Sequence, residues 1–212
     1  MRLYTFWRSS AAYRVRIALN LKGLPYQSVP KKFKDAEHRQ PDYLAVNPQG
    51  LIPALDHAGQ ILSQSLAIIE YLDEIQRDPP LLPANALDRA RVRSLAQAIA
   101  CDIHPLNNLR VLQYLKGPLG HDEDATNTWY RHWIDEGFKG LETEARRWSG
   151  NGRHLFGSMT SIADICLVPQ MYNARRYQCD LTPYPTLIAI SEALEQQPAF
   201  QAARPEAQPD RE

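Results

Sequence analysis

The feature that most constrains the fold is a change in hydrophobic periodicity at residues 77–83. This segment holds three prolines in seven residues and follows no period, so we expect it to be a linker region. Before it, short strand-like apolar runs alternate with helical spacing, whereas after it only the helical spacing continues. The pattern predicts an α/β N-terminal domain at residues 1–80, a linker at residues 81–87 and an all-α domain at residues 88–212.

The N-terminal part predicts the β-α-β, β-β-α order of a thioredoxin-like domain. Strands are expected at residues 3–6, 26–29, 52–55 and 60–62. Ser9 and Ser10 precede the first helix and Gly23 follows it, as helix-capping residues do. Ser65 begins a further helix, and a polar, proline-bearing stretch fills residues 31–48.

The C-terminal part predicts helices alone. An apolar stripe from Val92 to Leu115 indicates one long helix that Pro105 bends. Further helices are expected at residues 123–148, at residues 162–177 and after Pro185. Ser161 and Asp164 have the spacing of a capping box, and the tail after Pro205 is expected to be disordered.

Composition excludes several classes of function. Lysine plus arginine and aspartate plus glutamate each number 24, so the chain offers no general attraction to nucleic acid or to an anionic membrane. No run approaches the roughly 20 apolar residues of a membrane span, and the N-terminus does not read as a signal peptide. The three cysteines lack metal-ligand spacing. We therefore expect a reduced, cytoplasmic protein without a metal site.

Two motifs narrow the function further. They are Arg-Ser-Ser at residues 8–10 and Leu-Thr-Pro-Tyr-Pro at residues 181–185, and they are accompanied by characteristic segments at residues 47–55, 64–72, 103–108 and 163–170. Over nearly its whole length the chain resembles zeta-class glutathione transferases, which include maleylacetoacetate isomerases and bacterial maleylpyruvate isomerases. The resemblance implies the glutathione transferase fold, glutathione as cofactor and a homodimer.

The resemblance also implies a glutathione site. Ser9, with Ser10 beside it, would hydrogen-bond the glutathione sulfur at a helix N-terminus, where a thiol ionises more readily. Pro53 would be a cis-proline that exposes the backbone of Ile52 to the tripeptide. The other residues that the resemblance places at glutathione are His38, Gln49, Gln64, Ser65, His104 and Asn108. His104 and Asn108 are four residues apart and would share one helix face.

Plain structural roles remain open for these residues. The serines could be simple helix caps, Pro53 an ordinary trans-proline and His38 a solvated surface residue. One position departs from the class, because Ala11 stands where the class usually has cysteine. A cysteine-assisted mechanism is therefore excluded.

The implied substrate is a maleyl-keto dicarboxylate, isomerised from cis to trans in the breakdown of aromatic compounds. Arg8, Arg110 and Arg176 match positions that meet the substrate carboxylates, and Arg8 is also expected to stabilise the developing enolate. Maleylpyruvate and maleylacetoacetate are not separated by the sequence. The alternatives are a general glutathione transferase or peroxidase, and a non-catalytic module of the same fold.

Overall fold

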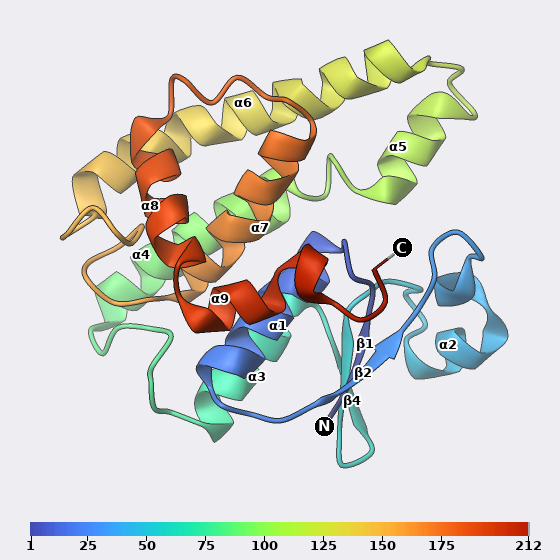
Figure 1. Ribbon diagram of the computed structural model, residues 1–212, viewed down its shortest axis with the longest axis horizontal. Coiled ribbons are helices and arrows are strands. Elements are labelled where there is room, and N and C mark those ends of the chain that lie inside the picture. The colour runs from blue at the N-terminus through green and yellow to red at the C-terminus, as the bar shows by residue number, and fades with distance from the viewer. Residues whose placement is uncertain (212) are drawn as a thin grey trace. The chain divides into compact units, whose positions relative to one another are not determined.

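The computed structural model describes residues 1–211 and divides into two compact units (Figure 1). The first unit consists of residues 1–81 together with residues 195–211, and the second of residues 82–194. The C-terminal segment therefore belongs with the N-terminal α/β unit, whereas the sequence places it in the helical domain.

The first unit is built on a mixed sheet. The described residues form four strands, β1 (Arg2–Thr5), β2 (Gln27–Pro30), β3 (Ala54–His57) and β4 (Gln60–Ser63), in the order β2-β1-β3-β4. β1 runs parallel to β2 and antiparallel to β3, which is antiparallel to β4. This arrangement confirms the predicted thioredoxin-like order, with each strand within two residues of its expected position.

Helices cover both faces of this sheet. On one side lie α1 (Ser10–Leu21), α3 (Ser65–Ile75) and α9 (Pro198–Ala203), and on the other α2 (Pro41–Val46) (Figure 1). Ile17, Leu55 and Ile68 are fully buried in the core. α2 and the short 3₁₀ helix before it, Glu37–Arg39, fall in the stretch for which the sequence predicts no element. Pro41 lies in the first turn of α2, where backbone N–H groups have no partner within the helix, so the missing N–H of proline costs no hydrogen bond.

The C-terminal segment corrects a second expectation, because it is ordered rather than disordered. α9 packs along α1, and a 3₁₀ helix, Pro205–Ala207, follows it. Asn20 of α1 donates from Nδ2 to the carbonyl of Ala199, 3.0 Å away. Gln208 donates to the carbonyls of Ala202 and Arg204 at 3.0 and 2.9 Å. Asn20 and Ala199 lie 179 residues apart along the chain, so no local sequence pattern predicts their contact.

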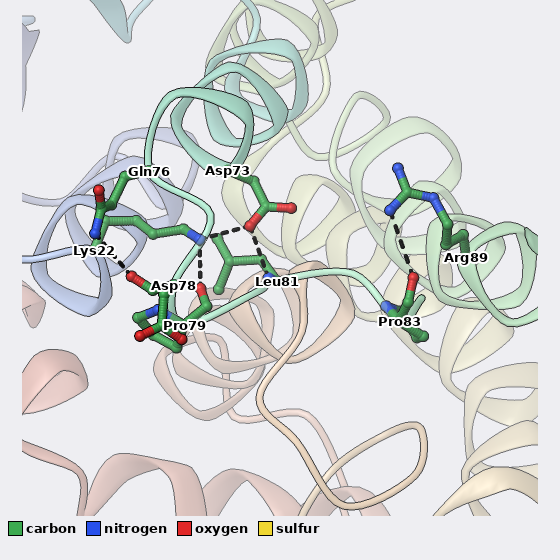
Figure 2. A network of polar contacts seen from close by, with 8 residues as sticks. All are labelled: Lys22, Asp73, Gln76, Asp78, Pro79, Leu81, Pro83 and Arg89. Carbon is green, nitrogen blue, oxygen red and sulfur yellow. Dashed lines mark hydrogen bonds and ion pairs between the residues drawn. The ribbon is translucent and has the colours of Figure 1, made fainter. Parts of the chain in front are cut away.

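The expected linker region is partly fastened to the first unit, as Figure 2 shows. The buried ammonium of Lys22, at the end of α1, pairs with Asp73 Oδ1 at 2.6 Å and donates to the carbonyl of Pro79. The same Asp73 oxygen accepts the N–H of Leu81 at 2.8 Å. A fully buried lysine requires such partners because an unpaired buried charge is costly. Residues 79–81 are therefore a fixed part of the first unit.

The second unit is entirely helical. Its α-helices are α4 (Ala86–Gln97), α5 (Leu109–Lys116), α6 (Glu123–Trp148), α7 (Ile162–Arg176) and α8 (Pro185–Glu195). The bounds of α6 match the prediction at both ends, and α7 ends one residue earlier than expected. Within residues 1–211, no helix is both long and apolar enough to cross a membrane.

The predicted single helix through Pro105 is wrong. α4 passes into a π-helical segment, Ala98–Ile103, a turn follows, and α5 begins anew at Leu109. A Cβ added at Gly137 of α6 would lie 2.2 Å from Cδ1 of Ile103. The π-helical segment thus packs against α6 at a position where only glycine leaves room. The widened turn of the segment is the part that makes this contact.

Candidate functional site

The Ser9 turn, residues 6–9, connects β1 to α1. The N–H of Ser9 donates to the carbonyl of Phe6 at 3.0 Å, and Oγ of Ser9 accepts the N–H of Ala12 at 3.2 Å. Ser9 is therefore the N-cap of α1. A serine hydroxyl that accepts one hydrogen bond still has its own hydrogen to donate. The capping role and a sulfur-binding role are thus compatible in one side chain.

The helix start beside Ser9 is electropositive. α1 has no acidic residue in its first turn, so no side chain there offsets the positive end of the helix dipole. Ser10 is the first residue of the helix and is buried, and Ala11 follows it. The first turn of α1 therefore suits an anionic group, and Ala11 places a methyl group where the resembled class usually has a thiol.

The expected cis-proline is confirmed, because the Ile52–Pro53 peptide bond is cis and lies directly before β3. The preceding carbonyl, that of Leu51, accepts hydrogen bonds from Tyr43 Oη at 2.6 Å and Asn47 Nδ2 at 2.8 Å. Burial raises the pKa of Tyr43 to about 12, so the phenol keeps its proton at neutral pH. Two buried donors thereby fix the chain just before the cis peptide.

Gln64 and Ser65 lie at the start of α3, as predicted. Gln64 is the N-cap, with φ 69° and ψ 116°, a backbone conformation that non-glycine residues rarely adopt. Its side chain does not cap the helix but donates from Nε2 to Gln49 Oε1 at 2.9 Å. Ser65 is the first helical residue, and its hydroxyl lies 3.4 Å from Nη1 of Arg14. The simple N-cap alternative for Ser65 is therefore wrong.

His38 is buried, which overturns the alternative of a solvated surface residue. Its ring lies 4.2 Å from the ring of Phe33, centroid to centroid. Among residues 1–211, its Nδ1 has no hydrogen-bond partner. Burial, and to a smaller degree the charge of Arg39, lowers the pKa of His38 below its usual range. The imidazole is therefore neutral near pH 7 and keeps a polar atom for a ligand.

The sequence reasoning overlooked two buried arginines of α1. Arg14 is 1% exposed and Arg16 is fully buried. Burial lowers the pKa of Arg16 to about 10, which leaves the guanidinium charged at neutral pH. The available signal was their position, since they alternate with Val15 and Ile17 inside an apolar run. Arginine in such a run must find buried acceptors.

Four of the expected residues, His104, Asn108, Arg110 and Arg176, belong to the second unit. His104 follows the π-helical segment, whereas Asn108 is the N-cap of α5. Their predicted shared helix face is therefore wrong, because the turn between them breaks the helical register. Asn108 Oδ1 accepts the N–H of Arg110 at 3.2 Å, so these two are adjacent at the start of α5.

The predicted substrate arginines have exposed side chains. The guanidinium of Arg8 lies 5.0 Å from the ring centre of Trp7 in the first unit. That of Arg176, the last residue of α7, lies 4.9 Å from the ring centre of Tyr177. A guanidinium held against an aromatic ring keeps its charge and loses conformational freedom. Each is therefore partly ordered before any ligand binds.

Comparison with known proteins identifies relatives of this chain. Residues 1–74 match the N-terminal domain of glutathione S-transferases. A probable maleylacetoacetate isomerase of Vibrio cholerae is 50% identical over 210 residues, 98% of this chain and 97% of the relative.

Solved structures give the same result. A holo structure of maleylpyruvate isomerase, described as a bacterial zeta-class glutathione S-transferase, superposes with a TM-score of 0.98 at 48% identity and covers 100% of both chains. A maleylacetoacetate isomerase from Methylobacterium extorquens, with bound malonate and GSH (glutathione), gives a TM-score of 0.94 at 42% identity and covers 99% of this chain and 98% of the other.

Proposed function

Because this chain belongs to the zeta class of glutathione transferases, we propose that it is a glutathione-dependent cis–trans isomerase of maleyl-keto acids. Its product is the fumaryl isomer, formed in the breakdown of aromatic compounds. The observation that carries the chemistry is the geometry of Ser9, whose hydroxyl caps α1 through one lone pair and keeps its hydrogen for a sulfur atom.

The residues of the first unit fit glutathione. The tripeptide has a γ-glutamyl end, a cysteinyl centre and a glycyl carboxylate. Gln64 and Ser65 at the start of α3 suit the γ-glutamyl carboxylate, because helix N-termini attract anions. The backbone of Ile52 suits the cysteinyl centre. Nδ1 of His38, buried and without a partner among the described residues, suits the glycyl end together with Gln49.

When bound, glutathione supplies a thiolate that makes the cis double bond transiently single. Ser9 donates its hydroxyl hydrogen to the sulfur, and the N-terminus of α1 favours the ionised form of the thiol. The N–H groups of the first turn and the guanidinium of Arg8 stabilise negative charge on the keto oxygen of the substrate. Since Ala11 has no thiol, the chain itself contributes no sulfur at this position.

Arginines hold the substrate in this proposal. Arg8, Arg110 and Arg176 would bind its two carboxylates, since a planar guanidinium pairs with a carboxylate through two parallel hydrogen bonds. His104 and Asn108 are proposed as further glutathione-binding residues, as the zeta-class match implies. The support for these roles is the match to the zeta class together with the exposed guanidinium groups.

The enzyme is proposed to work as a homodimer in the cytoplasm. The dimer is inferred from the zeta class. The cytoplasmic location is supported by Cys101, Cys166 and Cys179, none of which forms a disulfide within residues 1–211, as is usual in a reducing compartment.

The test follows the ultraviolet absorbance of maleylpyruvate, and separately of maleylacetoacetate, with and without glutathione. We expect decay that requires glutathione. In Arg176→Ala, kcat/KM should fall about 100-fold, because one charged contact with the substrate is lost. Arg175→Ala, at the exposed neighbouring position, is the matched control. The compound that decays faster shows which of the two keto tails the enzyme prefers.

Other outcomes select the alternative functions. Activity on a chlorinated aromatic acceptor, without isomerisation, would indicate a general transferase. Failure to bind a glutathione-affinity column would favour a non-catalytic module.

A further inference from the structure

Arg16 holds the Ser9 turn from inside the first unit. The guanidinium is fully buried beneath the turn. Nη2 donates to the carbonyl of Trp7 at 2.9 Å, and Nη1 lies 3.3 Å from the carbonyl of Phe6. Nη1 also donates to Thr5 Oγ1 at 3.1 Å. The carbonyl of Phe6 is the same one that accepts the N–H of Ser9. The guanidinium of Arg16 and the N–H of Ser9 therefore share one acceptor, the carbonyl of Phe6.

Asp210 holds the same turn from the C-terminal segment. Its Oδ2 accepts the N–H of Trp7 at 2.9 Å, across a separation of 203 residues. The peptide group before Trp7 is thus held on both sides, its carbonyl by Arg16 and its N–H by Asp210, and the peptide group after Trp7 is held at its carbonyl by Arg16. Arg16 holds the carbonyls and Asp210 holds the N–H. This leaves the turn little freedom to rotate about the Trp7 backbone.

The C-terminal segment is anchored well enough to serve as a support. Nε of Arg16 donates to the carbonyl of Ala203 at 3.0 Å, so one guanidinium bridges the segment and the turn. Asn20 donates to the carbonyl of Ala199. The side chain of Gln208, between α9 and Asp210, donates to the carbonyls of Ala202 and Arg204. These hydrogen bonds fasten the segment to α1 and so fix the place of Asp210 beside the Ser9 turn.

We infer that Arg16 and Asp210 are positioning residues for the glutathione sulfur, acting through the Ser9 turn, and that the C-terminal segment is part of this support. The inference rests on the proposed function, because it concerns the same thiol. The turn sets the direction of the Ser9 hydroxyl and of the first N–H groups of α1. Electrostatic stabilisation of a thiolate depends on that direction, since hydrogen bonds weaken steeply when misaligned.

The chemistry of the two side chains suits this task. A guanidinium offers five N–H donors in a rigid plane, and here they reach the carbonyls of Phe6, Trp7 and Ala203. A lysine offers a single nitrogen and cannot reach all three. Asp210 needs only one acceptor oxygen for its bond to Trp7, which an asparagine also supplies.

The experiment measures the thiol of bound glutathione. Its thiolate absorbs in the ultraviolet, so titration of the complete enzyme with glutathione gives an apparent pKa in each variant. In Asp210→Ala and Arg16→Lys we expect this pKa to rise by about 0.5 to 1 unit and kcat/KM to fall about threefold to tenfold, the size of one helix-terminus interaction. Asp210→Asn keeps the acceptor and should stay within about twofold of wild type.

The control is Asp35→Ala, which removes an exposed carboxylate from the same unit. It should leave both quantities unchanged. A thiol pKa equal to wild type in both Asp210→Ala and Arg16→Lys overturns the inference, as does an asparagine variant that behaves like the alanine variant. Should Arg16→Lys not fold, the Asp210 pair decides alone. If wild type forms no thiolate signal with glutathione, the proposed function fails first.

Discussion

Nε2 of Gln64 donates a hydrogen bond of 2.9 Å to Oε1 of Gln49. The zeta-class resemblance assigns these residues to opposite ends of glutathione, yet in the protein they contact each other. Each amide keeps a second polar atom, Oε1 of Gln64 and Nε2 of Gln49, that can bind the tripeptide. The bond therefore orients both amides before glutathione arrives and reduces the entropy lost on binding.

Gln64→Gly is expected to separate binding from stability. Glycine adopts the observed φ of 69° without strain, so the free energy of unfolding should rise by about 1 kcal/mol. The dissociation constant for glutathione should rise about tenfold, because a hydrogen bond to a carboxylate is lost. Urea unfolding and isothermal titration calorimetry measure the two effects.

Gln64→Ala is the matched control for that variant. Alanine loses the same side chain but keeps the unfavourable backbone conformation, so its binding should match that of the glycine variant without the gain in stability. A glycine variant that binds glutathione as tightly as wild type would remove Gln64 from the site.

Ser9→Asn is expected to separate capping from catalysis. Asparagine caps helices about as well as serine, so the melting temperature should change little. With its oxygen in the cap, the longer carboxamide cannot place an N–H where the serine hydroxyl was, so kcat/KM should fall about 100-fold, the usual effect of losing one donor to a developing anion. Ser9→Thr keeps both functions and should retain most activity. The role of Ser9 at the sulfur would be refuted by an asparagine variant of wild-type activity.

Asp164→Ala is expected to destabilise the second unit. Asp164 is fully buried and accepts the N–H groups of Leu155 at 2.7 Å and Ser161 at 2.8 Å, besides the Ser161 hydroxyl. Leaving these buried donors unsatisfied should cost about 2–4 kcal/mol in the free energy of unfolding. Asp122→Ala removes the exposed N-cap of α6 and should cost about 1 kcal/mol. Equal losses of unfolding free energy for the two variants in urea would contradict the view that burial makes the hydrogen bonds of Asp164 the more important.

Asp56 is expected to make stability depend on acidic pH. The hydrogen bond from Arg2, and then that from the N–H of Gly59, holds the pKa of Asp56 below its usual range. A depressed folded-state pKa contributes stability that is present above the unfolded value of 3.8 and is lost as the pH falls through the folded value.

Asp56→Asn should therefore flatten this loss. Unfolding by urea at a series of pH values between neutrality and pH 3 would show wild type losing more stability than the variant. Asp35→Asn, at an exposed position, should follow wild type. Parallel curves for wild type and Asp56→Asn would show that the Arg2 pair does not contribute.

Much of the secondary structure could be predicted because its signals are local. Ser9 caps α1 and Gly23 follows it with φ 62°, as the sequence indicates. The capping box of Ser161 and Asp164 is present at the start of α7. Each signal lies within a few residues of the element that it bounds, so the neighbouring chain is sufficient to establish it.

The break between α4 and α5 could not be predicted from such signals. The apolar stripe continues through Ile103, and Pro105 suggests a bend rather than an end. At the break Ile103 packs against Gly137, more than thirty residues away, which is a contact that no local signal reports. Asn108 then caps a new helix, which removes it from the helix face expected for His104.

The sequence by itself therefore determined the order of the four strands, the helix ends that carry local caps, and the family. Tertiary structure alone decided that the C-terminal segment belongs to the first unit, that Arg14 and Arg16 are buried, and that Gln64 meets Gln49. The physical reason is range. Caps and hydrophobic periods act over a few residues, whereas the acceptors of Arg16 come from both ends of the chain and meet only when the core has packed.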